Sequence, residues 1–296
     1  MLIYKDNMLV FEDYYEGHQY QWDAPGHYGS YITWDMDTPH CIHSDTKSIT
    51  SLCIGVAIDQ GYIESVHQSI FDYLPDHQNF RTTEKEKITI EHLLTMRMGI
   101  ERESYNNYSV YQELYQSENW IKSTIEYPLV SDPGEQMRYN TFITHLLSGV
   151  ITEATGQPTD KFARRHLFDP MGIDIDYWEK DPQGICFGGN SMHVTPREMA
   201  TFGLMYLQGG MLDGKQIIPQ AWVEQSLTPS TDLTHPNEWG SWKNYNYAYL
   251  WWLGQFSGYD SFMAYGYGGQ FVIVFPELDL IVVTTAENNV PPEDTN

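Results

Sequence analysis

The sequence has few basic residues. Only 16 lysines and arginines stand against 40 aspartates and glutamates, so the 296-residue chain has a formal net charge of -24. A chain this acidic repels the phosphate backbone of nucleic acids and the anionic surface of a membrane at ordinary salt. We therefore expect neither as a partner. Two interpretations of the charge stay open: a well-solvated surface, or an electrostatic preference for cationic or neutral substrates.

Cysteines are also few. Cys41, Cys53 and Cys186 are an odd number and show no C-x-x-C spacing, which predicts neither a disulfide framework nor a thiolate zinc site. His40 and His43 flank Cys41, but zinc would need further ligands at suitable spacing, and the sequence has no H-E-x-x-H motif. We expect no metal and no cofactor.

Long hydrophobic runs are missing. No stretch reaches membrane-spanning length, and the apolar run at the N-terminus is too short for the hydrophobic region of a secretory signal. This pattern predicts a cytoplasmic protein, or a periplasmic or secreted one if an export signal has been removed. Hydrophobic residues still make up 41% of the chain and aromatic residues 15%, which is enough for an extensive core.

Strand patterns occur at the two ends of the chain. Near the N-terminus, two runs around the turn dipeptide Asp6-Asn7 predict a hairpin, at 2–5 and 8–14. Near the C-terminus, β-branched and aromatic runs predict an antiparallel meander, at 261–265, 271–275 and 280–285. A two-stranded hairpin is marginally stable alone, so we expect hairpin and meander to pair in one sheet.

Helical patterns lie between these strands. Apolar residues at three- and four-residue spacing, each set followed by glycine, predict helices over 49–57, 89–98, 142–155 and 196–207. The segment 102–120 has weak periodicity and is predicted as a long loop beside the site. The order of predicted strands, then helices, then strands along the chain predicts an α+β fold. It has a sheet-containing lobe, 1–64 and 195–296, and an inserted, mostly helical lobe, 65–194. A substrate cleft is expected between the lobes.

Ser44 and Lys47 lie where the first helix is expected to start. Residues three apart share a helix face and are about 5 Å apart along the axis, so Lys47 can reach the Ser44 hydroxyl. A lysine activates a serine only when burial and the helix N-terminus lower the lysine pKa. The Ser44 backbone N–H, an unpaired donor of the first turn, can face a developing oxyanion. The alternative is an ordinary capped helix start with a solvated lysine.

Further motifs bear on this choice. A tyrosine motif stands at 138–149, preceded by Asp132-Pro133-Gly134. With it, the sequence resembles the serine β-lactamase-like superfamily, in the branch of class C β-lactamases, esterases and 6-aminohexanoate-dimer hydrolases. Other landmarks of that superfamily match at 46–51, 90–96, 195–200 and 266–270. The resemblance implies a β-lactamase-like α+β fold, with an antiparallel sheet built from both chain ends, flanking helices and an inserted helical lobe. It also implies a serine hydrolase that forms an acyl-enzyme.

The resemblance gives Tyr139 the role of passing a proton to the leaving group. A phenol with a pKa of about 10 can do so only beside a cation such as Lys47. The alternative is a buried structural tyrosine. Thr141 stands where the Y-x-N motif has asparagine, which weakens the expected hydrogen bond to an amide substrate. The adjacent Asn140 is a candidate substrate-binding residue.

The third motif of the family matches Ala264-Tyr265-Gly266, which makes the backbone N–H of Tyr267 the second oxyanion donor. Gly266 and Gly268 suit a backbone that lies against a substrate. The alternative is a glycine-rich hairpin turn alone. Ala264 replaces the usual lysine, so the carboxylate of a penicillin loses its expected anchor. Esters or uncharged amides fit better.

Aromatic residues supply the remaining substrate candidates. Tyr247, Tyr249 and Trp251 alternate on a predicted strand and Trp252 follows, which fits either a pocket or core packing. The resemblance alone adds Trp178 and Tyr105. The predicted function is a carboxylesterase or amide hydrolase acting on small substrates. The alternatives are a β-lactamase or D-amino-acid peptidase, and a catalytically silent sugar- or peptide-binding module.

Overall fold

A seven-stranded antiparallel sheet forms one side of the molecule. The structure is a computed structural model that describes residues 1–21, 24–101, 108–230 and 240–286. The strand order of the sheet is β10-β11-β12-β13-β14-β1-β2. In that order the strands are β10 (Trp242–Tyr247), β11 (Trp252–Phe256), β12 (Tyr259–Gly266), β13 (Gln270–Phe275), β14 (Leu280–Thr284), β1 (Leu2–Lys5) and β2 (Met8–Glu12).

The two ends of the chain meet in this sheet. Strand β1 pairs antiparallel with β14, with Leu2 opposite Val283. The turn between β1 and β2 has positive φ angles at both Asp6 and Asn7, which the tightest hairpin turns require. The predicted sheet built from the N-terminal hairpin and the C-terminal meander is therefore confirmed.

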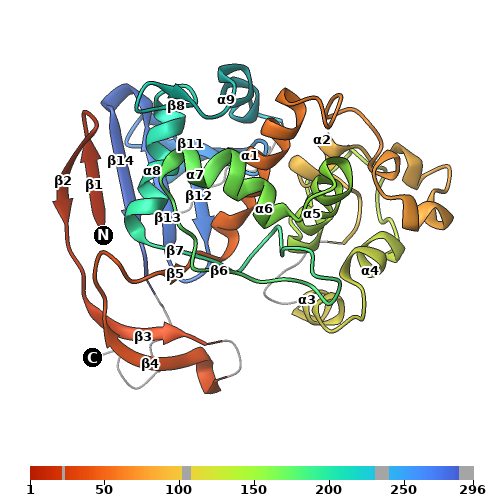
Figure 1. Cartoon of the computed structure of the whole chain (residues 1–296), viewed down its shortest axis with the longest axis horizontal. Helices are drawn as coiled ribbons and strands as arrows, with labels where there is room; N and C mark the ends of the chain where they lie inside the picture. Colours follow the sequence, from red (N-terminus) through yellow and green to blue (C-terminus); the bar gives the residue numbers. More distant parts are fainter. Residues whose placement is uncertain (22–23, 102–107, 231–239, 287–296) are drawn as a thin grey trace.

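Helices pack on the sheet and beside it. Their bounds are α1 (Thr46–Asp59), α2 (Ile90–Leu94), α3 (Tyr108–Tyr115), α4 (Trp120–Glu126), α5 (Thr141–Thr155), α6 (Thr159–Ala163), α7 (Asp169–Met171), α8 (Pro196–Leu207) and α9 (Gln220–Ser226). Helix α8 covers β13, β14 and β1, while α2, α4 and α5 gather on the other side of α1 (Figure 1). Helix α1 contacts both β12 and α5, so it lies where the sheet meets the helical region. The exact division of the chain into two lobes stays a prediction.

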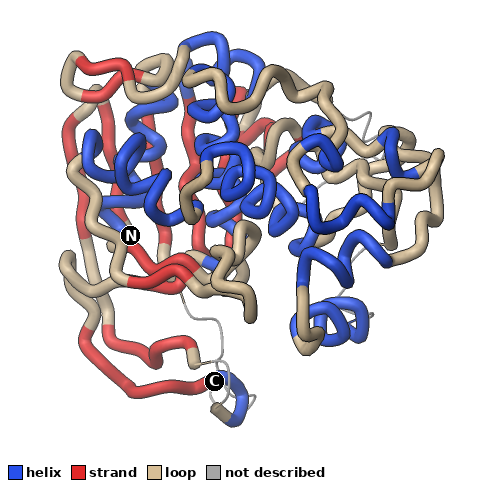
Figure 2. Tube along the Cα trace, turned by 45° about the vertical axis from the view of Figure 1, so that its right-hand side comes forward, coloured by secondary structure: helices blue, strands red, loops and turns tan. Residues whose placement is uncertain are grey.

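Short strands complete the architecture. A three-stranded sheet joins the segment before α1 to the segment before α8, in the order β5 (His40–Cys41), β7 (Met192–Val194) and β6 (Tyr177–Trp178). Two hairpins remain: β3 (Glu16–Tyr20) with β4 (Tyr28–Thr33), and β8 (Met211–Leu212) with β9 (Lys215–Gln216). Figures 1 and 2 show the β3–β4 hairpin standing apart from the main sheet. No helix in the described ranges is long and apolar enough to cross a membrane.

Two predicted elements differ from the structure. The helix predicted over 89–98 ends at Leu94, because the backbone of Met96 has a positive φ of 56° and the chain turns away. The strand predicted to carry Tyr247, Tyr249 and Trp251 is wrong. Strand β10 ends at Tyr247 and β11 begins at Trp252, and the chain reverses between them through Leu250, where φ is 63°.

The segment predicted as a long loop over 102–120 is also partly helical. It contains α3 and the first residue of α4, while 102–107 lie outside the described residues. Helix α3 packs through Val110 and Leu114 against the rings of Trp120, Phe142 and Phe187. Val110 and Leu114 are four residues apart and share one face of α3, so the packing of that face against distant residues stabilises this short helix.

The turn before α1 holds a buried carboxyl group. Asp45 belongs to the 3-10 turn η2 (His43–Asp45), its exposed fraction is 3%, and neither carboxyl oxygen has a hydrogen-bond partner within the described structure. Burial raises the pKa of this carboxyl well above its ordinary value, although the positive charge of Lys47 acts in the opposite direction. The folded protein therefore keeps a proton on Asp45 under conditions where the unfolded chain releases it.

Replacing Asp45 by asparagine should change how stability depends on pH. Because the folded pKa is raised, the contribution of Asp45 to stability is full below the unfolded pKa and is lost as pH rises. The Asp45→Asn variant should therefore gain unfolding free energy relative to the wild type above pH 4, by about 1.4 kcal/mol per pH unit until the folded carboxyl ionises. Urea unfolding at pH 4, 5.5 and 7 measures this gain.

The matched control is Asp59→Asn, which removes an exposed carboxyl at the other end of the same helix. It should show no such trend. A gain for Asp45→Asn that stays constant from pH 4 to pH 7 would contradict the buried, protonated carboxyl.

Candidate active site

The turn η2 and the first turn of α1 place a serine and a lysine together. Lys47 Nζ lies 2.9 Å from Ser44 Oγ. Ser44 is partly exposed, whereas the exposed fraction of Lys47 is only 2%. The hydroxyl is therefore open to a substrate while the amine is shielded from water, which suits proton transfer from the serine to the lysine.

Lys47 also forms hydrogen bonds with Thr141 and Gly189. Its Nζ donates to Thr141 Oγ1 at 3.1 Å and to the carbonyl oxygen of Gly189 at 2.7 Å. To accept a proton from Ser44, Lys47 must be the neutral amine. Thr141 and Gly189 can accept from its two N–H groups, which leaves the lone pair for the Ser44 hydroxyl. Thr141 and Gly189 are buried, so Ser44 is the partner of the three that a substrate can reach.

The segment Gly188-Gly189 lies against α5 closely enough to require glycine. A Cβ at Gly188 would lie 2.6 Å from the Thr144 carbonyl oxygen, and one at Gly189 would lie 2.4 Å from that of Thr141. The Gly188 carbonyl accepts a hydrogen bond from Thr50 Oγ1 at 2.7 Å. Sequence reasoning missed this segment, because a Gly-Gly pair by itself indicates only a turn.

Tyr139 lies beside the lysine. Lys47 Nζ is 4.9 Å from the centre of the Tyr139 ring, a distance typical of a cation–π contact. The Tyr139 ring stacks on Trp252 with a centroid distance of 6.0 Å and meets Tyr247 edge-on at 6.4 Å. Burial, and then the neighbouring Tyr139, raise the pKa of Tyr247 well above its ordinary value. Tyr247 therefore keeps its proton, while partly exposed Tyr139 and Trp252 form an aromatic wall next to the lysine.

The turn between β12 and β13 lies against η2. A Cβ at Gly266 would lie 2.2 Å from the Ile42 carbonyl oxygen, so Gly266 is packed against the protein's own backbone. Gly268 has a φ of 83° and forms the turn. The exposed ring of Tyr267 meets the His43 ring edge-on at 5.7 Å. Tyr267 therefore lies beside the residue that precedes Ser44.

His43 adds no positive charge at this point. Burial lowers its pKa to about 4, with smaller effects from His193 and Lys47. At neutral pH the imidazole is uncharged, and its Nδ1 lies 3.7 Å from Cys41 Sγ. Within the described ranges, no three His, Cys, Asp or Glu side chains lie close enough to hold a metal ion.

Other residues predicted for the site lie elsewhere or have structural contacts. Asn140 is fully buried at the start of α5, where its Oδ1 accepts from the Phe142 N–H at 2.9 Å and its Nδ2 donates to the Glu101 carbonyl at 3.2 Å. Trp178 is buried, and its Nε1 donates to the Phe187 carbonyl at 3.0 Å. Both positions favour structural roles. Tyr105 lies outside the described residues.

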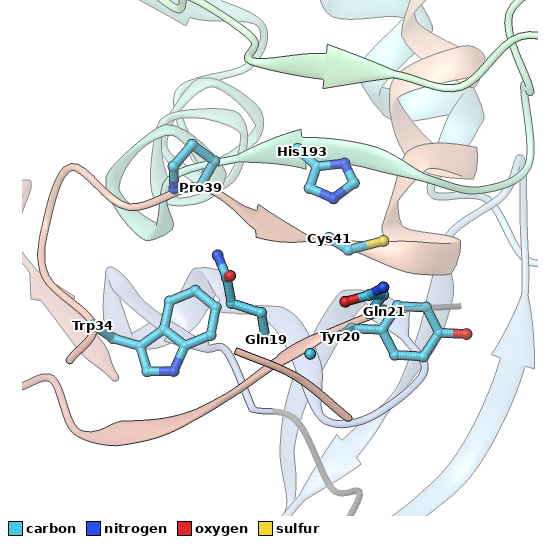
Figure 3. A pocket seen from close by; sticks show the side chains of 8 residues that line it. Gln19, Tyr20, Gln21, Trp34, Pro39, Cys41 and His193 are labelled. Carbon is cyan, nitrogen blue, oxygen red and sulfur yellow. The ribbon is translucent and has the colours of Figure 1, made fainter. Parts of the chain in front are cut away.

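A separate small cavity of about 170 Å³ lies between the β3–β4 hairpin and the strands β5 and β7 (Figure 3). Its lining residues are Gln19, Tyr20, Gln21, Gly29, Trp34, Pro39, Cys41 and His193. Ser44 does not line it. Tyr20, which lines the cavity, meets the ring of His43 edge-on at 4.6 Å, and His43 precedes Ser44 in the chain.

Comparisons with known proteins identify the family of the chain. A family model described as "Beta-lactamase" matches residues 1–296. A curated relative, the 6-aminohexanoate-dimer hydrolase of Paenarthrobacter ureafaciens, is 24% identical over 83% of this chain and 66% of its own. The resemblance to a family thus extends over the full sequence.

Solved structures share the fold. The octameric penicillin-binding protein homologue from Pyrococcus abyssi has a TM-score of 0.72 at 19% identity, over 99% of this chain and 70% of that one. EstCE1, a hydrolase with promiscuous acyltransferase activity, has a TM-score of 0.72 at 14% identity, over 97% of this chain and 87% of that one. With its whole length matched by the family model, the chain belongs to the beta-lactamase family of serine hydrolases and has the α+β fold of that superfamily.

Proposed function

We propose that this protein hydrolyses small esters or uncharged amides through an acyl-enzyme formed on Ser44. The observation that carries the proposal is the buried Lys47 amine 2.9 Å from Ser44 Oγ, with its two other hydrogen bonds fixed by Thr141 and Gly189. A serine hydroxyl is a weak nucleophile until a base within hydrogen-bond reach removes its proton. Lys47 is in place to be that base.

The proposed reaction follows from this arrangement. Ser44 Oγ attacks the acyl carbon while Lys47 accepts its proton, and Tyr139 protonates the departing alcohol or amine. The backbone N–H groups of Ser44 and Tyr267 hold the oxyanion. Water then attacks the acyl group and releases the acid. The packing of Gly266 against Ile42 supports the role of Tyr267, because it brings the β12–β13 turn to the serine.

The substrate class follows from charge and shape near Ser44. Ala264 is a buried residue of β12 and offers no cation to a substrate carboxylate. Tyr139 and Trp252 present aromatic surface beside the lysine. A curated relative is named for hydrolysing a 6-aminohexanoate dimer, and EstCE1 is named as a hydrolase with acyltransferase activity. The two names support a small ester or amide substrate, and the lack of a cation at Ala264 is the feature that argues against a required carboxylate.

The first test is covalent labelling of Ser44. We expect a fluorophosphonate to label the wild type at Ser44 and the wild type to turn over a p-nitrophenyl ester, and Ser44→Ala to lose both. Ser48→Ala is the matched control. It removes a buried hydroxyl one turn along α1, which donates to the Leu250 carbonyl, and it should keep labelling and turnover.

Two outcomes would count against the proposal. A wild type that is neither labelled nor active on the ester would leave the silent sugar- or peptide-binding module as the better explanation. Hydrolysis of the β-lactam nitrocefin as fast as the ester would contradict the substrate class but not the nucleophile.

The second test compares two neighbouring tyrosines. Tyr139→Phe removes the hydroxyl group from the ring beside Lys47. Turnover should therefore fall by roughly 10²- to 10⁴-fold, as expected for loss of a general acid. Tyr247→Phe is the control, because this buried tyrosine keeps its proton and lies behind Tyr139. It should change turnover little. Steady-state kinetics, at temperatures where both variants are folded, measure the turnover of each variant. Unchanged turnover in Tyr139→Phe would exclude Tyr139 from the mechanism.

A further inference from the structure

A buried histidine–aspartate pair lies next to the segment that contacts Lys47. His145 is on α5 and Asp181 is in the loop after β6, and both side chains are fully shielded from solvent. His145 Nε2 lies 3.0 Å from Asp181 Oδ2, and Nδ1 lies 3.2 Å from the carbonyl oxygen of Cys186. The histidine therefore joins α5 to both ends of the loop 181–186.

The hydrogen-bond partner of Nδ1 fixes one proton of the imidazole. A carbonyl oxygen only accepts, so Nδ1 of His145 donates to Cys186. Asp181 Oδ1 accepts from the backbone N–H groups of Gln183 at 2.9 Å and Ile185 at 2.8 Å, and its Oδ2 shares the hydrogen bond with His145 Nε2. The two directional hydrogen bonds of the imidazole hold the loop in one position.

The loop held by this pair leads directly to the site. After Cys186, the Gly188 carbonyl accepts from Thr50 Oγ1 and the Gly189 carbonyl accepts from Lys47 Nζ, both at 2.7 Å. His145 is one helical turn after Thr141, so one face of α5 presents both residues. The Thr141 hydroxyl contacts Lys47 directly, and His145 holds the segment that supplies the second acceptor, the Gly189 carbonyl.

We propose that the His145–Asp181 pair positions Lys47 for catalysis. By holding the segment 186–189, the pair keeps the Gly189 carbonyl where it orients the lysine toward Ser44. The inference rests on the proposed role of Ser44 and Lys47. Misplacing a catalytic group by about 1 Å can slow a reaction by about 10²-fold. The pair is buried and touches no substrate, so its loss should slow acylation without weakening substrate binding.

The main variant is His145→Phe. Phenylalanine keeps a ring among Trp120 and Phe187, which pack on His145 at centroid distances of 5.3 and 5.7 Å, and it removes both hydrogen bonds. We expect the acylation rate constant with p-nitrophenyl acetate, measured in single turnovers, to fall at least tenfold. The substrate concentration that gives half of the maximal single-turnover acylation rate should stay within twofold of the wild type.

Asp181→Asn is the conservative variant. Its amide oxygen can still accept from the N–H groups of Gln183 and Ile185, and its NH2 group can donate to His145 Nε2. The loop then stays attached to α5, so acylation should remain within threefold of the wild type. If the acylation rate falls in His145→Phe and is retained in Asp181→Asn, the rate depends on the hydrogen bonds between α5 and the loop and not on the stability of the fold.

Two further variants separate positioning from folding. Tyr206→Phe removes a buried hydroxyl on α8 that accepts from Trp251 Nε1 at 2.8 Å. It should lower the unfolding midpoint without slowing acylation. Thr50→Val removes the hydrogen bond to the Gly188 carbonyl and tests the same segment by a milder change if His145→Phe does not fold. It should slow acylation several-fold with the half-maximal substrate concentration unchanged.

The inference is wrong if folded His145→Phe or Thr50→Val acylates Ser44 within twofold of the wild-type rate. It is equally wrong if Tyr206→Phe slows acylation as much as they do. A wild type that is not acylated at Ser44 at all would overturn the proposed function, and this inference with it.

Discussion

The hydrogen bonds of one buried amine organise this protein. Lys47 Nζ contacts Ser44 Oγ, Thr141 Oγ1 and the Gly189 carbonyl, and the last two partners lie 94 and 142 residues from it along the chain. A charged or polar group removed from water is destabilising unless its hydrogen bonds are replaced. The fold must therefore bring two distant segments to one nitrogen atom, and an error in either leaves a hydrogen bond of that buried group unmade.

The architecture meets this requirement by placing α1 between the sheet and the helical region. Contacts with β12 on one side and α5 on the other fix the helix that carries Ser44 and Lys47 (Figure 1). Close packing of Gly188 and Gly189 against α5 brings a backbone carbonyl to the lysine, and the packing of Gly266 on Ile42 brings the β12–β13 turn to the serine side. Both approaches depend on glycine, since a Cβ would collide with backbone at each position.

Local patterns in the sequence predicted the parts of this arrangement that depend on short-range spacing. The three-residue separation of Ser44 and Lys47 gives their contact, and the β-branched runs at the chain ends give the sheet that the structure confirms. Long-range contacts could not be predicted in this way. Nothing near Gly189 in the sequence indicates a lysine partner.

Two differences between the sequence-based predictions and the structure show how tertiary contacts decide between local alternatives. Asn140 and Thr141 are adjacent, and the sequence favoured the asparagine as the residue of the site. In the structure Asn140 caps α5, so its side chain points to the backbone of its own helix, and Thr141 contacts the lysine. The alternating aromatic residues from Tyr247 to Trp251 suggested one strand, but the positive φ of Leu250 reverses the chain there. Its N–H bonds to the Leu94 carbonyl, a partner that the local pattern does not reveal.

The proposed mechanism depends most on Lys47 as the base that activates Ser44, and its most direct test is the acylation rate of Lys47→Met. Methionine keeps an unbranched side chain of similar length in the buried site and cannot accept a proton. In single turnovers with p-nitrophenyl acetate, folded Lys47→Met should acylate Ser44 roughly 10²- to 10⁴-fold more slowly than the wild type, as for loss of a general base. A rate within tenfold of the wild type, with the adduct still mapped to Ser44, would contradict the proposed mechanism.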